Sequence, residues 1–195
     1  MFDEEQGRSM RIAVFGKPGG GKSTLSQQIA AATGLPLHQL DLVQFVEGGN
    51  RVPDEIFLSR HSAILASPQW VIDGFGTPRS FEDMLRAADV LVYVERAAFV
   101  HYWWVTKRFL LSPFIKPLGW PARSPLFKST ISSYQYLRRS NRFWTAEFRA
   151  KLLALRPGKR VYIVNRQSDA ATLLNELNDE RKHKERFDGH KIDAR

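Results

Sequence analysis

The chain has 195 residues, of which 43% are hydrophobic and 25% are charged, and it contains no cysteine. This composition fits one globular domain with a full hydrophobic core, and it excludes a disulfide-stapled scaffold and a wholly disordered chain. No apolar run reaches the ~18 residues that a membrane-spanning helix needs, and the N-terminus is acidic and polar, unlike a signal peptide. We therefore expect a soluble, cytoplasmic protein in which residues 1–9 form a disordered leader.

The formal net charge of +9 is concentrated in one third of the chain. The segment from Ala97 to Arg160 has 13 lysines and arginines but a single acid, Glu147, whereas the rest has 16 basic and 19 acidic residues. The same segment holds 13 of the 23 aromatic residues. A basic, aromatic segment can face nucleic acid, an anionic membrane or a phosphorylated small molecule, and composition alone does not separate these partners.

Short apolar runs alternate with stretches of helical length along the chain. The apolar runs predict strands over 11–15, 37–40, 70–73, 90–94 and 161–164. The intervening patterns predict helices over 24–33, 54–66, 80–88, 97–111, 130–155 with interruptions, and 168–177. Strands separated by such helices form βαβ units, which predicts an α/β fold with a parallel sheet covered on both faces. Ser80 and Asp83 have the spacing of a capping box, and the charged tail 179–195 is expected to be a frayed helix or disordered.

A glycine-rich motif follows the first predicted strand and opens the first predicted helix. The pattern Gly16-x-x-x-x-Gly21-Lys22-Ser23 is that of a phosphate-binding P-loop in the context the motif requires. Its glycines let backbone N–H groups point at phosphate oxygens, Lys22 reaches the β- and γ-phosphates, and the Ser23 hydroxyl ligates Mg²⁺. The alternative is a glycine-rich turn that binds nothing. The predicted nucleotide-binding residues are Gly16, Lys17, Pro18, Gly19, Gly20, Gly21, Lys22, Ser23 and Thr24.

Two acids, Asp41 and Asp73, end predicted strands at the edge where an open α/β sheet places its ligands. P-loop proteins commonly place a second acid near the metal, so Asp73 is expected to join Ser23 as a Mg²⁺ ligand or to orient the phosphoryl acceptor. A helix-capping or turn role is the alternative for Asp73. Asp41 is a candidate acceptor contact or general base, with an ordinary turn carboxylate as its alternative.

The order of these motifs resembles the adenylate-kinase-like branch of P-loop kinases, and within it the group known as DNA topology modulation proteins. The resemblance covers residues 10–178 and rests on the P-loop, Leu-Pro-Leu-His-Gln-Leu-Asp (35–41), Trp-Val-Ile-Asp-Gly (70–74) and Ala-Asp-Val-Leu-Val-Tyr-Val-Glu (88–95). It implies a five-stranded parallel sheet in the order 2-3-1-4-5, transfer of the ATP γ-phosphate to a small acceptor, and a mobile lid after the fourth strand. The basic, helical region 97–157 would be that lid.

Some positions match the family pattern and others depart from it. Asp73-Gly74-Phe75 resembles the Asp-Gly-Phe of adenylate kinases, but Pro78-Arg79 comes two residues later than in those proteins. Glu95-Arg96-Ala97 stands where the related group has Asp-x-Pro. By resemblance, Arg79 would grip the acceptor and Arg166, after the last strand, would stack on adenine.

The basic region contains candidate lid residues. Arg138 and Arg142 share a helical face and could stabilise the charge of the transferring phosphoryl group, with a solvated helix face as the alternative. A membrane-surface helix is not expected, because residues 97–111 include only two basic residues. The aromatic residues of that stretch are expected to be core or interface residues, which makes a homodimer reasonable; they are Phe99, Tyr102, Trp103 and Trp104.

These observations predict an ATP- and Mg²⁺-dependent kinase that acts on a nucleotide, a nucleoside or a similar metabolite. Its candidate catalytic residues are Lys22, Asp41, Asp73, Arg138 and Arg142. One alternative is a nucleic-acid-associated P-loop protein that uses the basic residues of 97–160. Another is a P-loop scaffold that binds nucleotide without catalysis.

Overall fold

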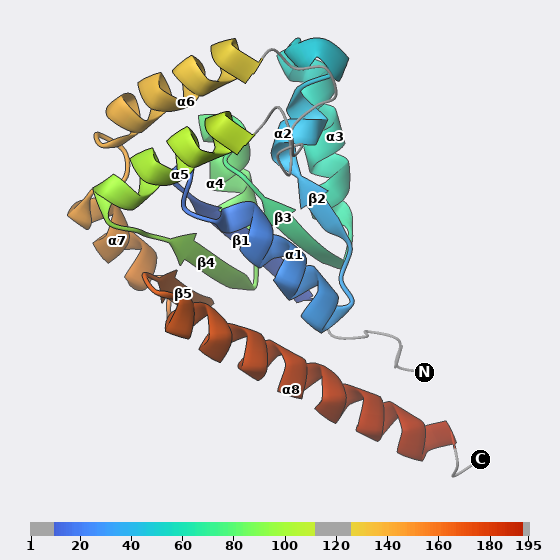
Figure 1. Cartoon of the computed structure of the whole chain (residues 1–195). Coiled ribbons are helices and arrows are strands. Elements are labelled where there is room, and N and C mark those ends of the chain that lie inside the picture. Colours follow the sequence, from blue (N-terminus) through green and yellow to red (C-terminus); the bar gives the residue numbers. More distant parts are fainter. Residues whose placement is uncertain (1–9, 112–125, 193–195) are drawn as a thin grey trace.

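The structure, a computed structural model, describes residues 10–111 and 126–192, which form helices on both faces of one parallel sheet (Figure 1). The strands pair in the order β2-β3-β1-β4-β5, and every neighbouring pair is parallel. This is the fold class predicted above, and the strand order is the one that the family resemblance implied. The strands are β1 (Met10–Gly16), β2 (Leu37–Gln39), β3 (Gln69–Asp73), β4 (Val90–Val94) and β5 (Arg160–Val164).

The helices connect and cover these strands. In chain order they are α1 (Lys22–Thr33), α2 (Leu40–Gln44), the 3-10 turn η1 (Glu47–Gly49), α3 (Asp54–Ala66), α4 (Pro78–Ala87), α5 (Ala98–Leu111), α6 (Leu126–Ser140), α7 (Ala146–Leu153) and α8 (Gln167–Ile192). No helix in the described part of the chain is long and apolar enough to cross a membrane.

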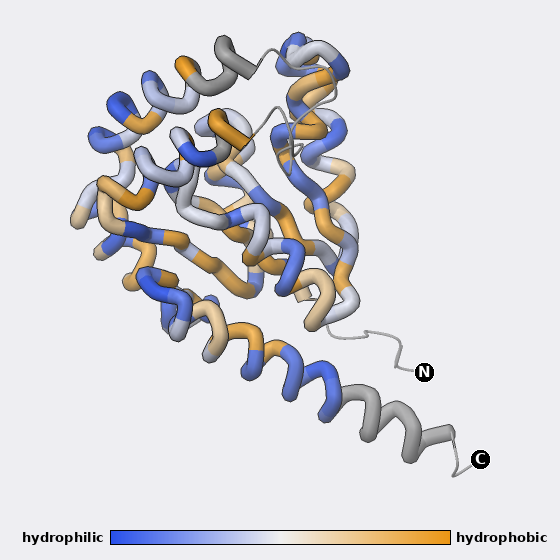
Figure 2. Tube along the Cα trace, in the orientation of Figure 1, coloured by the Kyte–Doolittle hydropathy of each residue, from blue (hydrophilic) through white to orange (hydrophobic). Residues whose placement is uncertain are grey.

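Both faces of the sheet are buried, because successive apolar side chains along a strand point alternately to a core on one face and a core on the other. Along β1, Ala13 and Phe15 belong to the core beneath α3, α4 and α7, whereas Ile12 and Val14 belong to the core beneath α1 and α8. All four side chains are fully buried. Figure 2 shows the hydrophobic strands at the centre and, in the coloured part of α8, hydrophilic residues where the helix leaves the sheet.

Two local predictions were wrong, and a third was right in part. The capping residue of α4 is Thr77, which forms a capping box with Ser80, and Pro78 takes the first helical position; Ser80 itself does not start the helix. The second strand ends at Gln39, so Asp41 lies in the short helix α2. The last helix runs past its expected end near residue 177 to Ile192, which agrees with the helical one of the two alternatives given for the charged tail.

Aromatic packing fixes the segment that returns from α6 to the sheet. The ring of Trp144 stacks on Tyr93 of β4 at a centroid distance of 5.4 Å and on Phe15 of β1 at 6.1 Å. Phe143 and Phe148 pack edge-on against the same indole and are tilted against each other. Trp144 is 6% exposed, so this end of the predicted lid is part of the core beneath the sheet.

Candidate active site

The P-loop lies where the sequence predicted it, between β1 and α1. Gly16 has φ 141°, and a Cβ added there would lie 2.2 Å from the carbonyl oxygen of Val94, so the close approach of β4 requires glycine. Gly21 precedes α1 in the left-handed region and gives the helix no side-chain cap. The first N–H groups of α1 are therefore left for an anion.

Two lysines flank this loop. Lys22 Nζ donates to the carbonyl oxygen of Lys17 at 2.9 Å, which holds the ammonium group across the loop. Lys17 Nζ donates to Asn141 Oδ1 at 2.7 Å. The segment that follows α6 is thus hydrogen-bonded to the loop, although the two residues are 124 positions apart in the sequence. Both cations favour an anionic ligand at this position.

Asp73 lies beneath the loop at the carboxyl end of β3. It pairs in register with Val14 of β1 and Gln39 of β2, and it is only 6% exposed. Burial raises the pKa of Asp73, while the charge of Lys22 and hydrogen bonding by Ser23 oppose that rise. The sheet register therefore brings together the residues that the sequence assigned to phosphate and metal binding.

The Asp73 carboxylate suits a divalent cation. Its Oδ1 atom is buried and makes no hydrogen bond of normal geometry, and the nearby Gln39 Nε2 is also unsatisfied. A buried, unpaired oxygen beside the Ser23 hydroxyl is the hard donor set that Mg²⁺ takes, with phosphate and water completing the coordination. The described residues contain no cluster of three or more His, Cys, Asp or Glu side chains, so an all-protein metal cage is not built there.

Asp41 lies on the solvent-exposed side of the same edge of the sheet. It is the second residue of α2 and is exposed. Burial raises the pKa of Tyr136 on α6; the Trp144 indole lowers it, and the negative charge of Asp41 adds to the rise. The negative charge of Asp41 therefore acts on a tyrosine of α6.

Helix α5 lies directly on the P-loop. The carbonyl oxygen of His101 would be 2.6 Å from a Cβ on Gly19, and the His101 ring would be 3.2 Å from a Cβ on Gly20. His101 Nδ1 lies 2.7 Å from the carbonyl oxygen of Pro18. Because that oxygen only accepts, Nδ1 carries the proton and donates. His101 therefore links α5, the first helix of the basic region, to the P-loop by a hydrogen bond.

A Gly19→Ala substitution tests this close contact. Gly19 has φ 73°, so the methyl group strains the backbone by about 1–2 kcal/mol and also meets the His101 carbonyl. We expect ATP affinity to fall about tenfold or more, since each 1.4 kcal/mol corresponds to a factor of ten. The control is Gly158→Ala, where a Cβ meets nothing within 4 Å. Equal ATP affinities for the two variants in a binding titration would contradict the contact.

His101 also makes the fold sensitive to acid. Burial lowers the pKa of His101 from its ordinary 6.5, Lys22 and Lys17 lower it further, and the bond to Pro18 opposes this. Below about pH 6.5 the unfolded chain binds more protons at this site than the folded one, so the free energy of unfolding falls as the pH falls. His101→Gln is expected to make that fall shallower between about pH 7 and pH 5 in denaturant titrations. Identical slopes for the variant and the wild type would exclude the effect.

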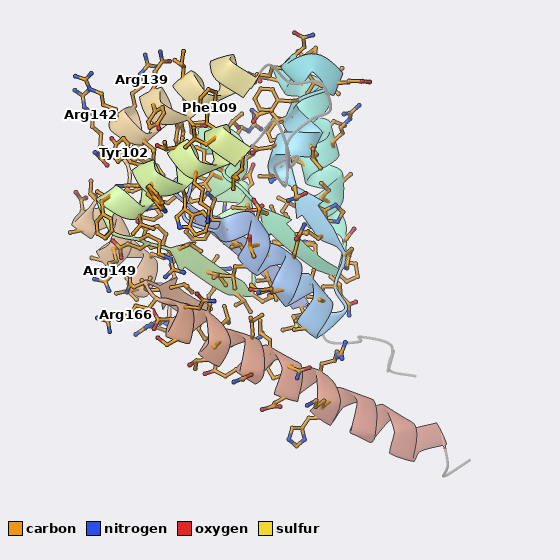
Figure 3. All side chains as sticks on the ribbon, in the orientation of Figure 1. Tyr102, Phe109, Arg139, Arg142, Arg149 and Arg166 are labelled. Atoms are coloured by element: carbon orange, nitrogen blue, oxygen red, sulfur yellow. The ribbon has the colours of Figure 1, made fainter. Side chains whose placement is uncertain are left out.

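The predicted arginines lie on the surface around this edge. Arg138 and Arg142 are exposed and, with Gln135 and Arg139, line a hollow of about 640 Å³. Figure 3 shows Arg139 and Arg142 projecting away from the sheet. Arg166 is exposed just after β5, where Asp169 accepts hydrogen bonds from its backbone N–H at 2.8 Å and from that of Asn165. The structure thus brings Lys22, Ser23 and Asp73 together, while these arginines remain at the periphery.

Four residues at the site were not predicted from the sequence. His101 is 1% exposed. The one sequence signal that could have identified it is its position four residues before the buried Val105, which places both residues on the inner face of α5. Ser26 lies one turn after Ser23 on α1 and contributes to the hydrogen bonding of Asp73. Gln39 reaches the site because β2 pairs with β3, and Asn141 reaches it because the chain returns to the P-loop after α6. The local sequence gives no signal for either arrangement.

Comparisons with known proteins support the fold. The sequence matches no protein-family model and no curated protein. A provisionally named kinase from Chloroflexus aurantiacus is similar in structure, with a TM-score of 0.50 at 15% identity over 88% of this chain and 98% of that protein. Shikimate kinase from Bacteroides thetaiotaomicron gives 0.48 at 15% identity over 89% and 98%, and a gluconokinase from Sinorhizobium meliloti gives 0.47 at 16% identity over 91% and 98%. At such identities the likeness concerns the fold alone.

Proposed function

We propose that the protein is an ATP-dependent phosphotransferase that acts on a small-molecule acceptor. The observation that carries this proposal is the convergence of Lys22, Ser23 and the buried Asp73 beneath a P-loop, at the carboxyl edge of β1 and β3. The kinase name of the structurally similar protein from Chloroflexus aurantiacus agrees with it. The adenylate-kinase-like motifs extend the candidate acceptors to nucleotides and nucleosides.

The P-loop residues would bind the triphosphate of ATP. The N–H groups at the start of α1 point to the phosphates, and Lys22 moves from the Lys17 carbonyl to the β- and γ-phosphates. Ser23 and Asp73 would hold Mg²⁺, which when bound neutralises charge on these phosphates. Arg166 would stack on the adenine, as the family resemblance suggests.

The acceptor would enter between α2 and α6. For an acceptor with a hydroxyl group, the hydroxyl oxygen would attack the γ-phosphorus as the bond to the β-phosphate oxygen breaks, and ADP would leave; a nucleoside monophosphate would attack through a phosphate oxygen and would need no general base. Asp41 would accept the proton of that hydroxyl. Arg138 and Arg142 lie at the periphery, so either would stabilise the charge on the transferring group only after α6 closes toward the P-loop, as a lid does in the family that the sequence resembles. Arg79, exposed at the start of α4, would contact the acceptor.

The experiment that tests this function is an acceptor panel. The full-length protein is incubated with Mg²⁺ and γ-labelled ATP together with nucleosides, nucleoside monophosphates, shikimate, gluconate and other sugars. We expect label transfer to one chemical class, and its loss in Asp41→Asn with ATP binding retained. Saturable ATP binding with no transfer to any acceptor would instead assign the P-loop to a non-catalytic scaffold.

A further inference from the structure

The outer face of α5 carries large apolar side chains that lie open to solvent. The exposed fractions are 74% for Phe99, 63% for Trp103 and 64% for Leu110. These three residues share one side of the helix and form a stripe about 17 Å long, which we call the apolar stripe. Trp104 and Leu111, at 48% and 40% exposed, lie about 100° further around the helix and widen the exposed apolar surface. These aromatic residues were expected in the core or at an interface; the core is wrong for Phe99, Trp103 and Trp104, and the interface stays a prediction.

The stripe cannot turn inward without breaking the contact with the P-loop. On the opposite side of α5, His101 is 1% exposed and bonded to the Pro18 carbonyl, and Val105 is 1% exposed. Val105 Cγ2 would be 3.2 Å from a Cβ on Gly19. The orientation of α5 is thus fixed by its inner face, and a contiguous apolar surface of this kind marks a site of interaction.

A basic group lies on the helix that carries the apolar stripe, and others lie on the neighbouring helix α6. Lys107 lies on α5 with its ammonium 4.8 Å from the ring centre of Trp104. Tyr102 stacks on Tyr134 at 6.0 Å and so joins α5 to α6, whose end carries the exposed Arg139. Within the described ranges, neither Lys107 nor Arg139 forms an ion pair. Helix α6 thus supplies positive charge that α5 alone lacks.

We infer that the apolar stripe docks the protein on the surface of an anionic phospholipid membrane. Tryptophan and phenylalanine are suited to the boundary between headgroups and acyl chains, and leucine to the outer acyl region. Lys107 and Arg139 would meet the phosphates of anionic headgroups, each contributing about fivefold to affinity, which corresponds to about 1 kcal/mol. The helix would lie along the membrane surface without crossing it.

The charge and shape of the region favour this partner over two others. A second copy of the chain would bring together two segments that each have 13 basic residues and one acid. Single-stranded nucleic acid would stack on the tryptophans, but it offers no apolar partner for the exposed Leu110 and Leu111. An anionic lipid surface offers phosphate groups to the basic residues and acyl chains to the exposed leucines.

Vesicle binding of the full-length protein tests the inference. Vesicles of phosphatidylcholine with about 30% phosphatidylglycerol are compared with pure phosphatidylcholine, without ATP, by sedimentation and by tryptophan fluorescence. We expect at least tenfold stronger partitioning onto the anionic vesicles, weakened by salt. The variant Phe99→Ser/Trp103→Ser/Leu110→Ser should lose at least tenfold, whereas Ile56→Ser, which removes a 45% exposed isoleucine from α3, should bind as the wild type does.

Three results would overturn the inference. The first is the absence of binding to anionic vesicles by the folded wild type. The second is a dimer in sedimentation equilibrium that the triple variant dissociates, which would assign the stripe to a second copy. The third is salt-sensitive binding of a single-stranded oligonucleotide that the triple variant abolishes while vesicle binding persists. Because no ATP is present, failure here leaves the phosphotransferase proposal untouched.

Discussion

Replacing Lys22 by Ala is expected to lower ATP turnover by roughly two to three orders of magnitude, the usual cost of removing one preorganised charge from the reacting phosphates. The ammonium is already held over the loop by the Lys17 carbonyl at 2.9 Å, so little rearrangement separates it from a bound triphosphate. Turnover is measured as ADP release in the presence of Mg²⁺, with and without the acceptor found by the panel.

The matched control is Lys182→Ala, which removes an exposed lysine from α8, far along the chain from the loop. It should leave turnover and ATP affinity unchanged. Thermal unfolding of both variants separates loss of the site from loss of the fold. If Lys22→Ala folds normally and still binds and hydrolyses ATP as the wild type does, the nucleotide site is elsewhere.

Asp73→Asn is expected to remove activity while leaving the protein at least as stable as the wild type. Burial raises the pKa of Asp73, which means that the folded state disfavours its charged form. Asparagine keeps the shape but removes both that cost and the hard anionic ligand, so we expect turnover to fall about 100-fold or more. Turnover and melting temperature are measured on the same preparation.

The sign of the stability effect depends on pH. The folded state takes up a proton at Asp73 at a higher pH than the unfolded state, so the carboxylate destabilises the fold at neutral pH and this cost disappears as the pH falls. The stability gain of Asp73→Asn should therefore be largest near neutral pH and fade in acid. Asp179→Asn, which removes an exposed carboxylate on α8, serves as the control. A strongly destabilised Asp73→Asn at neutral pH would show that the charge is needed to hold the fold.

The elements predicted best are those whose signals are local. The P-loop needs only glycines, Lys22 and Ser23 in a fixed order between an apolar run and a helix, and the structure places them so. The strands were found because buried parallel strands are short and apolar. Their order in the sheet was not encoded in any such pattern and came from the family resemblance.

The errors occurred where neighbours in space decide the outcome. Helix α2 begins at Leu40, which is fully buried in the core beneath α3 and α4, so packing ends the strand before Asp41. The cap of α4 shifted to Thr77 because Pro78 is favourable at the first helical position. The first change places Asp41 on a helix, and the second places Arg79 in the first turn of α4.

The basic region was the least predictable part of the site. Its aromatic residues look alike in the sequence, yet Trp144 is buried against Phe15 and Tyr93 while Trp103 is 63% exposed. Only the sheet and the P-loop, both distant in sequence, determine which of these rings is covered. The segment 112–125, which the sequence assigned to the lid, lies outside the described residues.

The most direct test of the proposed site is the Mg²⁺ dependence of ATP binding in the wild type and in Asp73→Asn, measured by calorimetric titration. The wild type should bind ATP at one saturable site, and Mg²⁺ should tighten that binding by about tenfold or more, which corresponds to 1.4 kcal/mol. Asp73→Asn should retain ATP binding but lose most of the Mg²⁺ effect. A wild type without saturable ATP binding, or a variant with an unchanged Mg²⁺ effect, would contradict the site described here.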